Sequence, residues 1–483
     1  MRKPFFAFAL AAGLGFIASR PLPAQTFTTL YNFSTVSGPS RYEGTNSDGA
    51  FPVASLLLSG NTLYGTAAAG GSSTNGTILA VNTDGTGFTN LHTFAGTGDG
   101  SNPYAPLISA GNVLYGTAYY GNNELGGNGT VFSVSDDGSN FTVLVSLAGP
   151  QGLSLSGNTL YVATGFYPGS GALWKLNTDG TGLATVYAFT GATETSSYSY
   201  TNSDGVAPLD PLIISGDTLF GTAVNGGIGG NGTVFKVNTN GSGFTVLHSF
   251  SAASGLIDDG TNSDGAVPGG VVLSGNTLYG ATYRGGSSSN GTVFAVNTDG
   301  TGFRLLHTFT PTSGPSSTNS DGANPSPYVI VSGNTLYGTT LYGGSFSNGT
   351  VYAVNTDGSG FKVLHTFTAY SGPNFTNSDG GYPYGGLIMS GNILYGTAEM
   401  GGTGGSGTIF SISLPPQLAI TASGPNVILT WPTNVAGLTL QSTPSLVVPV
   451  AWTPVSPGPV VVNGLNTVTN PMIGSQHFYR LRQ

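Results

Sequence analysis

A short pattern, Leu-Tyr-Gly-Thr or a close variant of it, recurs along most of this 483-residue chain. Its aromatic residue falls at Tyr64, Tyr115, Tyr161, Phe220, Tyr279, Tyr337 and Tyr395. By subtraction, the intervals between these positions are 51, 46, 59, 59, 58 and 58 residues. Such intervals are typical of propeller blades and exceed those of helical or leucine-rich solenoids. The pattern therefore predicts repeated units that must stack on one another to bury their faces.

The copy around Tyr279 indicates what one unit contains. Four segments read as strands: 271–273, 277–282, 291–296 and 303–309. Tight turns join the first strand to the second and the third to the fourth, because Ser-Gly-Asn and Asn-Thr-Asp-Gly tolerate positive φ. A longer Gly- and Ser-rich loop at 284–290 joins the middle pair. Each copy is therefore expected to form a four-stranded antiparallel sheet.

The two ends of the repeat region complement each other. The seventh copy stops after its third strand at 407–414, where Pro415 and Pro416 block continuation. An isolated segment near the N-terminus, FTTLYNF at 27–33, matches fourth strands such as FTVLHSF. We therefore predict an all-β fold over residues 25–414. It is a seven-bladed β-propeller closed by the N-terminal strand, a closure that leaves no open sheet edge.

The segments flanking the propeller have different compositions. Residues 1–24 combine a basic start, an apolar stretch and small residues, which predicts a secretory signal peptide. Residues 417–483 alternate apolar and polar residues without the repeat, which predicts a small β-sandwich. We expect a secreted or cell-surface protein with no membrane span in the mature chain.

Motifs of the repeat occur in a fixed order. L-Y-G-T-x-x-x-G-G precedes N-G-T-[VI]-[FYL], and D-G-x-x-F-x-x-L-H-x-F follows. Over residues 50–414 this order resembles the Gloeo/Verruco (GloVer) tandem repeat of exported bacterial proteins, and more distantly a kelch blade. The tail resembles a fibronectin type III or immunoglobulin-like module through its LTWP and YRL segments. The GloVer resemblance implies an exported propeller and implies no particular reaction.

The composition excludes several classes of partner. Charged residues make up 6% of the chain, with 11 basic against 20 acidic side chains and no cysteine. Removing a signal peptide with Arg2, Lys3 and Arg20 would leave 8 basic residues and a net charge of 8 − 20 = −12. Nucleic acids and anionic lipids require basic surfaces, so we expect neither as a partner. We expect a monomer without disulfide bonds.

Two sets of residues are candidates for binding, and both belong to the face that carries the longer loops. The aspartates of the N-S-D-G links are surrounded by Asn and Ser oxygens, which suits Ca²⁺ as well as a simple turn: Asp48, Asp204, Asp264, Asp321 and Asp379. Loop aromatics near the Gly-rich segments could stack on sugar rings at the mouth of a central channel: Tyr119, Tyr120, Tyr167, Tyr342 and Phe346. The fourth-strand histidines are interpreted as packing residues, because other copies place Tyr or Val there.

No catalytic motif is recognisable, and no cofactor other than Ca²⁺ is indicated. We therefore expect a non-enzymatic propeller that binds polysaccharide or another surface protein. A polysaccharide lyase or glycosidase is an alternative, and a structural adhesion or surface-layer protein is another. Glu399 or Glu124 clustered with Arg284 at the channel mouth would favour the enzyme, whereas uncharged polar walls would favour binding.

Overall fold

A computed structural model describes residues 25–482, except for 41–42, 122–127, 166–170, 197–198, 255–259, 315–316, 434–436, 449, 463–464 and 472–476. The expected signal peptide, Glu124 and Tyr167 lie outside the described residues. All regular elements of the described residues are β-strands, which confirms the all-β prediction. No helix in this part of the chain is long and apolar enough to cross a membrane.

The chain divides into two units. The repeat unit contains residues 27–389 and 394–412, and the tail unit contains residues 413–482 with the short stretches 25–26 and 390–393.

Antiparallel sheets in the repeat unit follow the copies of the sequence pattern, and the described residues form seven of them. Sheet 1 contains β2 (Leu57–Ser59), β3 (Thr62–Ala67), β4 (Thr77–Asn82) and β5 (Thr89–Thr93). Sheet 2 contains β6 (Ile108–Ala110), β7 (Val113–Ala118), β8 (Gly129–Ser135) and β9 (Thr142–Leu147). Sheet 3 contains β10 (Pro150–Ser156), β11 (Thr159–Gly165), β12 (Gly171–Asn177) and β13 (Ala184–Ala188).

The remaining sheets repeat this arrangement. Sheet 4 contains β16 (Ile213–Ser215), β17 (Thr218–Ala223), β18 (Thr233–Asn238) and β19 (Thr245–Ser249). Sheet 5 contains β20 (Ala266–Ser274), β21 (Thr277–Arg284), β22 (Thr292–Asn297) and β23 (Arg304–Thr308). Sheet 6 contains β24 (Ala323–Pro325), β25 (Ile330–Ser332), β26 (Thr335–Tyr342), β27 (Thr350–Asn355) and β28 (Lys362–Thr366). A hairpin absent from our prediction, β14 (Thr193–Ser196) with β15 (Ser199–Thr201), lies in the link between sheets 3 and 4.

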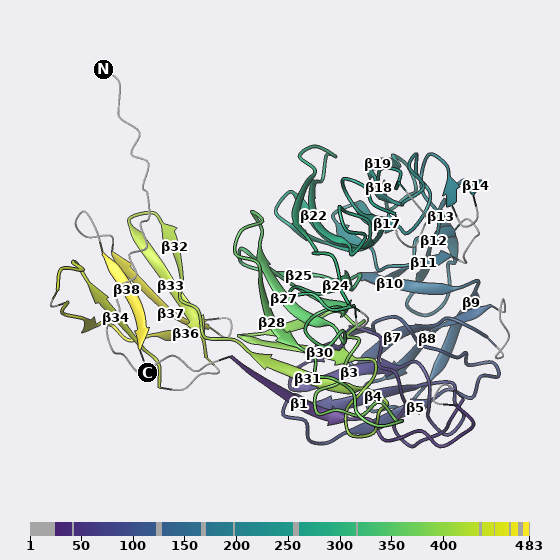
Figure 1. Cartoon of the computed structure of the whole chain (residues 1–483), viewed down its shortest axis with the longest axis horizontal. Coiled ribbons are helices and arrows are strands. Elements are labelled where there is room, and N and C mark those ends of the chain that lie inside the picture. The colour runs from purple at the N-terminus through teal and green to yellow at the C-terminus, as the bar shows by residue number, and fades with distance from the viewer. Residues whose placement is uncertain are drawn as a thin grey trace. The chain divides into compact units, whose positions relative to one another are not determined.

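Sheet 7 combines the two ends of the repeat unit. It contains β29 (Ile388–Ser390), β30 (Ile393–Ala398), β31 (Thr408–Ser413) and, as its outer strand, β1 (Thr26–Asn32). The Phe33 amide donates to the Gly407 carbonyl at 3.1 Å, and the Phe27 ring stacks on Phe410 at 5.2 Å. The predicted closure by the N-terminal strand is confirmed. Figure 1 shows β1 beside β31, with the successive sheets following one another around the unit.

Tight turns set the register within each sheet. In the turn after β27, the Asp357 carboxylate accepts hydrogen bonds from the Ser359 amide at 2.8 Å and the Ser359 hydroxyl at 2.7 Å. Gly358 adopts φ +89°, a conformation that glycine reaches at little cost. These contacts fully account for the N-T-D-G aspartates as turn residues.

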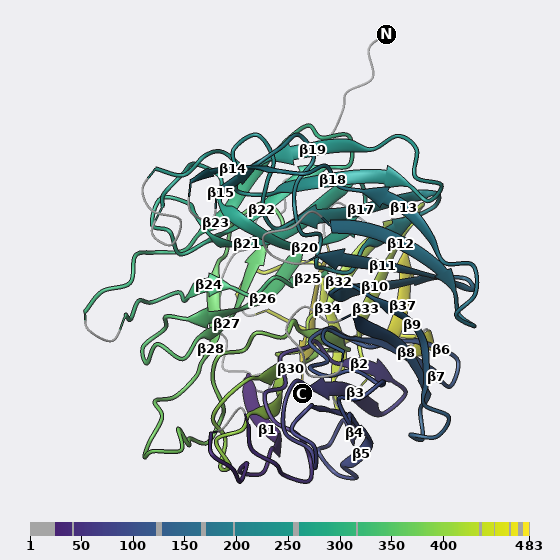
Figure 2. The same cartoon turned by 90° about the vertical axis from the view of Figure 1, so that its right-hand side faces the viewer.

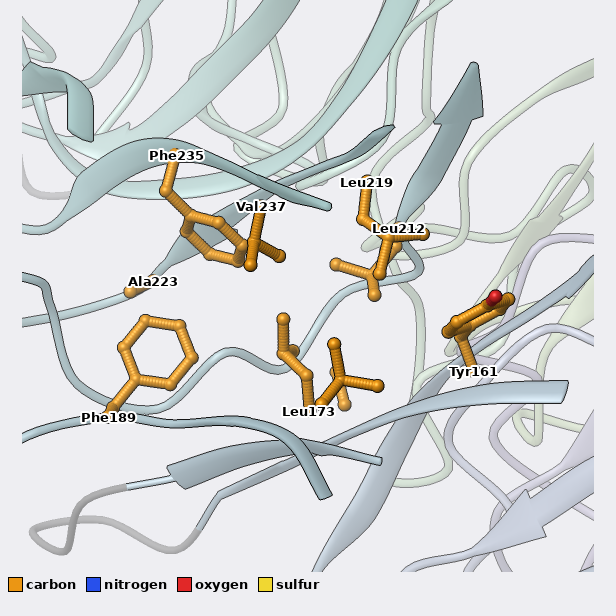
Figure 3. Close-up of a cluster of buried hydrophobic side chains, with 10 residues drawn as sticks. Tyr161, Leu173, Phe189, Leu212, Leu219, Ala223, Phe235 and Val237 are labelled. Carbon is orange, nitrogen blue, oxygen red and sulfur yellow. The ribbon is translucent and has the colours of Figure 1, made fainter. Parts of the chain in front are cut away.

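Apolar side chains from neighbouring sheets share a core. Between sheets 3 and 4, Leu173 and Phe189 pack against Leu212, Leu219 and Phe235, as Figure 3 shows. Figure 2, turned by 90° from Figure 1, shows the sheets of the repeat unit arranged around a common centre. Because one face of each sheet packs on the next, no sheet is buried without its neighbours. The fold is therefore of the propeller type.

The tail unit is a small β-sandwich. One sheet contains β32 (Ala419–Ser423), β33 (Asn426–Pro432), β37 (Leu465–Pro471) and β36 (Val460–Val462). The other contains β35 (Thr453–Pro454), β34 (Thr439–Thr443) and β38 (Phe478–Arg482). Leu429, Trp431, Leu440 and Val468 form the buried core between them. Membership of the fibronectin type III or immunoglobulin class stays a prediction.

Candidate functional site

The aspartates of the N-S-D-G links are buried, and each accepts hydrogen bonds from the outer strand of the preceding sheet. Asp264 accepts from His248 Nε2 at 3.0 Å and from the amide and hydroxyl groups of Ser251. His307 bonds Asp321 at 3.0 Å, and His365 bonds Asp379 at 2.9 Å. In the other two links a tyrosine replaces the histidine, so that Tyr31 bonds Asp48 at 2.8 Å and Tyr187 bonds Asp204 at 2.9 Å. We call each such pair a latch.

The ring in each latch also stacks on a phenylalanine of the next repeat. The His248 and Phe303 ring centroids lie 3.6 Å apart with their planes at 5°. Tyr187 stacks on Phe244 at 4.0 Å in the same manner. A latch therefore connects the outer strand of one sheet, the following link and the next sheet.

A sixth latch lies in a shorter link that the N-S-D-G pattern does not mark. His92 bonds Asp99 at 3.2 Å and stacks on Phe141 at 3.8 Å. Between sheets 2 and 3, Val145 of sheet 2 occupies the ring position and Leu183 of sheet 3 occupies the phenylalanine position, where it is 41% exposed. The paired loss of ring and phenylalanine is a signal from which the latches could have been recognised in the sequence.

Two opposing influences act on the pKa values of the latch carboxylates. Burial by itself would raise the pKa of Asp264, but hydrogen bonds from His248 and Ser251 outweigh it and lower the pKa. The same balance, with His307 and Thr310 as donors, lowers the pKa of Asp321. For Tyr187, burial and the adjoining Asp204 raise the phenol pKa to about 12. These carboxylates are therefore stabilised in their ionised form by protein donors.

The proposed calcium role of the link aspartates stays a prediction. Within the described ranges, no group of three or more His, Asp or Glu side chains is placed to hold a metal ion. A cation at Asp48 would compete with the Ser34 amide, the Ser34 hydroxyl and Tyr31 for the same carboxylate oxygens. The observed contacts give these aspartates a structural role that needs no metal.

A second polar group lies where the first strands of the sheets converge. The Gly386 amide in sheet 7 donates to the Ser55 hydroxyl in sheet 1 at 2.8 Å, so the inner edges of adjacent sheets touch. Asp210, which precedes β16, is 8% exposed and lies against Gly270 of sheet 5. A methyl group placed on Gly270 would lie 3.3 Å from Asp210 Cβ and 3.6 Å from Tyr328 Cδ1. Asp210 and Tyr328 therefore meet across an intervening glycine.

Tyr328 thus lies beside Asp210. Burial raises the pKa of Asp210 to about 7, and hydrogen bonding from the Tyr328 hydroxyl acts in the opposite direction. Burial also raises the pKa of Tyr328, and the charge of Asp210 adds to the rise. The pair joins sheet 4 to sheet 6 at the centre of the ring.

Further tyrosines and Glu399 extend this group towards solvent. Tyr384 is 38% exposed, yet burial, followed by Asp210, Tyr283 and Glu399, raises its pKa. Burial raises the pKa of Tyr104 to about 12, with Tyr120 and Glu399 adding to it. The charge of Glu399 thus adds to the raised pKa values of Tyr104, Tyr283 and Tyr384. We call Tyr104, Asp210, Tyr283, Tyr328, Tyr384 and Glu399 the axial cluster.

Arg284 and three of the predicted aromatic residues, Tyr119, Tyr120 and Tyr342, border the axial cluster. Burial raises the pKa of Tyr283 to about 12, to which Tyr342 and Glu399 add, while Arg284 opposes the rise. The Arg284 guanidinium lies 5.5 Å from the Tyr283 ring centroid. Tyr119 lies 6.0 Å from Tyr104, and it contacts Tyr120 at 4.6 Å. Phe346 is an exposed loop residue. The binding role of these aromatic residues stays a prediction.

Asp210, Tyr328 and Tyr384 were missed because no motif contains them. A comparison of the seven copies of the repeat could have revealed Asp210. The position to compare lies five residues before the serine or alanine of the first turn in each copy. Where sheet 4 has Asp210, the other copies have Ala54, Ala105, Gln151, Gly269, Pro327 and Gly385. A single acid among small or neutral residues marks a departure from the repeat that packing alone does not require.

The family model of the Gloeobacter/Verrucomicrobia repeat matches residues 11–199, 151–320 and 257–423. The chain belongs to the Gloeobacter/Verrucomicrobia repeat family. Its three matches cover the sheets that carry the latches and the axial cluster. The kelch resemblance stays a prediction, and no curated protein matches this Gloeobacter/Verrucomicrobia repeat protein.

Several solved structures are similar to the Gloeobacter/Verrucomicrobia repeat protein at low identity. The extracellular domain of the putative hybrid two component system BT4673 from B. thetaiotaomicron is 11% identical, with a TM-score of 0.46, and the match covers 86% of this chain and 42% of that one. An oligogalacturonate lyase in complex with manganese is 10% identical, with a TM-score of 0.45 and coverage of 83% and 99%. TolB from Acinetobacter baumannii is 12% identical, with a TM-score of 0.35 and coverage of 74% and 78%.

Proposed function

We propose that this protein is an exported, non-enzymatic propeller that binds carbohydrate at the axial cluster. Three observations support the proposal: Asp210 and Tyr328 lie together beside Gly270, Tyr104 lies 6.0 Å from Tyr119, and the charge of Glu399 adds to the raised pKa values of Tyr104, Tyr283 and Tyr384. Tyr104 and Tyr384 are 37% and 38% exposed, so a ligand can reach them from solvent.

The chemistry of the cluster suits a sugar. A tyrosine ring offers an apolar face for the C–H groups of a pyranose, and its hydroxyl both donates and accepts hydrogen bonds. Carboxylates accept hydrogen bonds from sugar hydroxyls, and such charge-assisted bonds are about twice as strong as neutral ones. A surface with these groups orients a ring without requiring any covalent step.

The proposal is tested by binding experiments with the mature protein and a panel of plant, algal and bacterial glycans. A ligand at 100 times its Kd should stabilise the folded state by about 2.7 kcal/mol, which a rise in Tm would report. Tyr104→Ala and Tyr384→Ala should each weaken binding by about 0.5–1.5 kcal/mol, the contribution of an aromatic contact. Ile228→Ala, at an exposed loop residue, is the control and should leave Kd unchanged.

The same glycan panel tests whether the loop aromatic residues contact the ligand. Phe346→Ala and Tyr119→Ala should weaken binding only if the ligand extends beyond the axial cluster. If no glycan shifts Tm, or if all four tyrosine and phenylalanine variants bind like the unaltered protein, carbohydrate binding at this site is ruled out.

Two observations favour cleavage of polysaccharide as a second candidate. Glu399 and Arg284 both act on Tyr283, and clustering of these two residues was expected of an enzyme. Burial raises the pKa of Asp210 to about 7, and Asp210 and Glu399 both act on Tyr384. Two carboxyl groups, one of them with a raised pKa, are what acid–base chemistry on a glycosidic bond requires. Release of shortened oligosaccharides that is abolished in both Asp210→Asn and Glu399→Gln would establish the enzyme. Binding without product would leave the non-enzymatic proposal standing.

A further inference from the structure

Charged side chains are divided unevenly between the two units of the chain. All 20 acidic side chains lie between Glu43 and Glu399, in the repeat unit, and the tail unit has none. Residues 27–412 carry 6 basic side chains, so their net charge is 6 − 20 = −14. With histidine neutral, the charged side chains of the tail unit are Arg480 and Arg482. The acidic balance of the whole chain therefore conceals a basic tail unit.

Both arginines lie on the outer face of one sheet of the tail unit, the face turned away from the core. In β38 the side chains of Tyr479 and Leu481 pack against the core. Because successive side chains of a strand point to opposite faces, Phe478, Arg480 and Arg482 lie on the outer face. Arg482 is exposed, and the two arginine positions are about 7 Å apart along the strand. Their guanidinium groups are therefore neighbours that a single ligand can contact.

The Arg480 side chain is held in place by two neutral groups. Its Nε–H donates to the Gln441 Oε1 atom at 2.9 Å, and its guanidinium carbon lies 4.3 Å from the Trp452 ring centroid. Gln441 is the cross-strand neighbour of Arg480 and is 8% exposed. A guanidinium fixed through Nε keeps its two terminal Nη groups for a further acceptor. The side chain is thus ordered before a ligand binds, which lowers the entropy cost of binding.

The charge of these arginines is not neutralised by a carboxylate among the described residues. Ion pairs in the described ranges join histidines to aspartates of the repeat unit. Neutral Gln441 and the Trp452 ring leave the positive charge of Arg480 in place. Burial, followed by the charge of Arg482, lowers the pKa of Arg480, as expected of two cations side by side. An anion bound between the two arginines would offset this repulsion.

We propose that this outer face, formed by Gln441, Trp452, Phe478, Arg480 and Arg482, binds an acidic polysaccharide whose sugar units carry carboxylate or sulfate groups. A guanidinium presents paired N–H groups that match such oxyanions. Two guanidinium groups in a row along a strand suit a polymer with charges on successive units. The partly exposed Phe478 ring adds an apolar surface for a pyranose. The site is separate from the axial cluster, and the inference does not depend on carbohydrate binding there.

The number of charges favours an acidic polysaccharide over other anionic partners. Segments that bind anionic membranes typically present clusters of about 4–8 basic residues, and proteins that bind nucleic acid neutralise several phosphates at once. The tail unit offers two arginines. A glycan needs fewer charges, because its hydroxyl groups add hydrogen bonds and its rings add aromatic contacts to the ionic ones.

The test measures the affinity of the mature full chain for three polymers with one backbone: carboxymethyl dextran, dextran sulfate and unmodified dextran. We expect at least one acidic polymer to bind about 10-fold or more tightly than dextran, because a hydrogen bond to a charged group contributes about that factor. Raising the ionic strength from about 0.1 M to 1 M shortens the screening distance from about 10 Å to 3 Å and should weaken this binding. The two acidic polymers distinguish recognition of carboxylate from recognition of sulfate.

Double variants of matched charge locate the site. Arg480→Gln with Arg482→Gln should weaken binding of the acidic polymer about 10-fold or more. Arg304→Gln with Lys362→Gln removes two positive charges from exposed positions of the repeat unit and should leave the affinity unchanged. Equal losses in the two double variants would show a general effect of charge and overturn the inference. Should the tail variant unfold, the exposed Arg482 decides, since an unchanged affinity in Arg482→Gln alone would also overturn it.

Three further outcomes would overturn the inference. Dextran could bind as tightly as its acidic forms, or binding of the acidic polymer could be lost in Tyr104→Ala and kept in the arginine variants. Vesicles containing phosphatidylserine could bind more tightly than either acidic polymer, which would make the face a membrane contact. Comparison of the Tyr104 and arginine variants keeps the two sites apart, so carbohydrate binding at the axial cluster can fail while this inference stands.

Discussion

At the scale of single residues, the latches explain how the short polar links are held against the sheets. Each buried aspartate satisfies a hydroxyl, an amide and a ring group, so that removing its carboxylate leaves buried donors without partners. Leaving such groups unsatisfied costs about 1–3 kcal/mol.

Asp321→Ala should therefore lower the free energy of unfolding by about 1–3 kcal/mol in urea titrations. The control is Asp357→Ala, which removes an exposed turn aspartate with two local hydrogen bonds and should cost less stability than Asp321→Ala does. Equal losses in the two variants would contradict the structural role of the latch.

The acid limb of the stability curve should also report on the latches. The folded-state pKa values of Asp264 and Asp321 lie below the ordinary value of 3.8, so their stabilisation is complete above that pH and is lost as the pH falls through the lowered values. Burial lowers the pKa of His92 below 6.5, so its protonation adds a loss of stability as the pH falls below 6.5.

Unfolding free energy measured against pH should therefore begin to fall below about 6.5 and fall again below about 3.8. In His92→Gln the first fall should become smaller and the second should persist. A curve that is flat down to pH 3 would show that these groups have the same pKa values in the unfolded chain.

At the scale of elements, β1 contributes more than its length suggests. Phe33 is fully buried, and Phe27 stacks on His365 at 3.8 Å and on Phe410 at 5.2 Å. Each buried phenylalanine contributes about 1.5–3 kcal/mol, so the strand supplies much of what holds an ordinary domain together.

Deleting residues 25–34 should lower Tm sharply or cause aggregation, because the edge of β31 would be exposed. Adding a synthetic peptide of the same ten residues should restore part of the Tm, whereas a scrambled peptide should not. An unchanged Tm in the deletion variant would show that closure by β1 contributes nothing to stability.

At the scale of the whole molecule, the repeated strands and turns could be predicted from the sequence, whereas the axial cluster and the latches were missed. Turn residues such as Asp357 and the period between aromatic residues such as Tyr279 determine each sheet locally, so the sheets and the closing strand could be predicted. The axial cluster depends on how sheets converge, and Asp210 and Tyr328 are 118 positions apart by subtraction. The latches were missed for a different reason, since N-S-D-G also suits an exposed turn and burial cannot be read from it.

The pairing of β1 with β31 also sets the order in which the chain can be completed. The Thr403 amide donates to the Asn32 side chain across 371 positions of sequence. A growing chain must therefore keep an early strand unpaired until a late one has been synthesised, and long-range pairings of this kind slow folding. Until that moment the ring is open and each of its two ends can capture a strand from another copy. The concentration of growing chains and the rate of their synthesis should therefore affect how much closed monomer and how much strand-exchanged oligomer form during biogenesis.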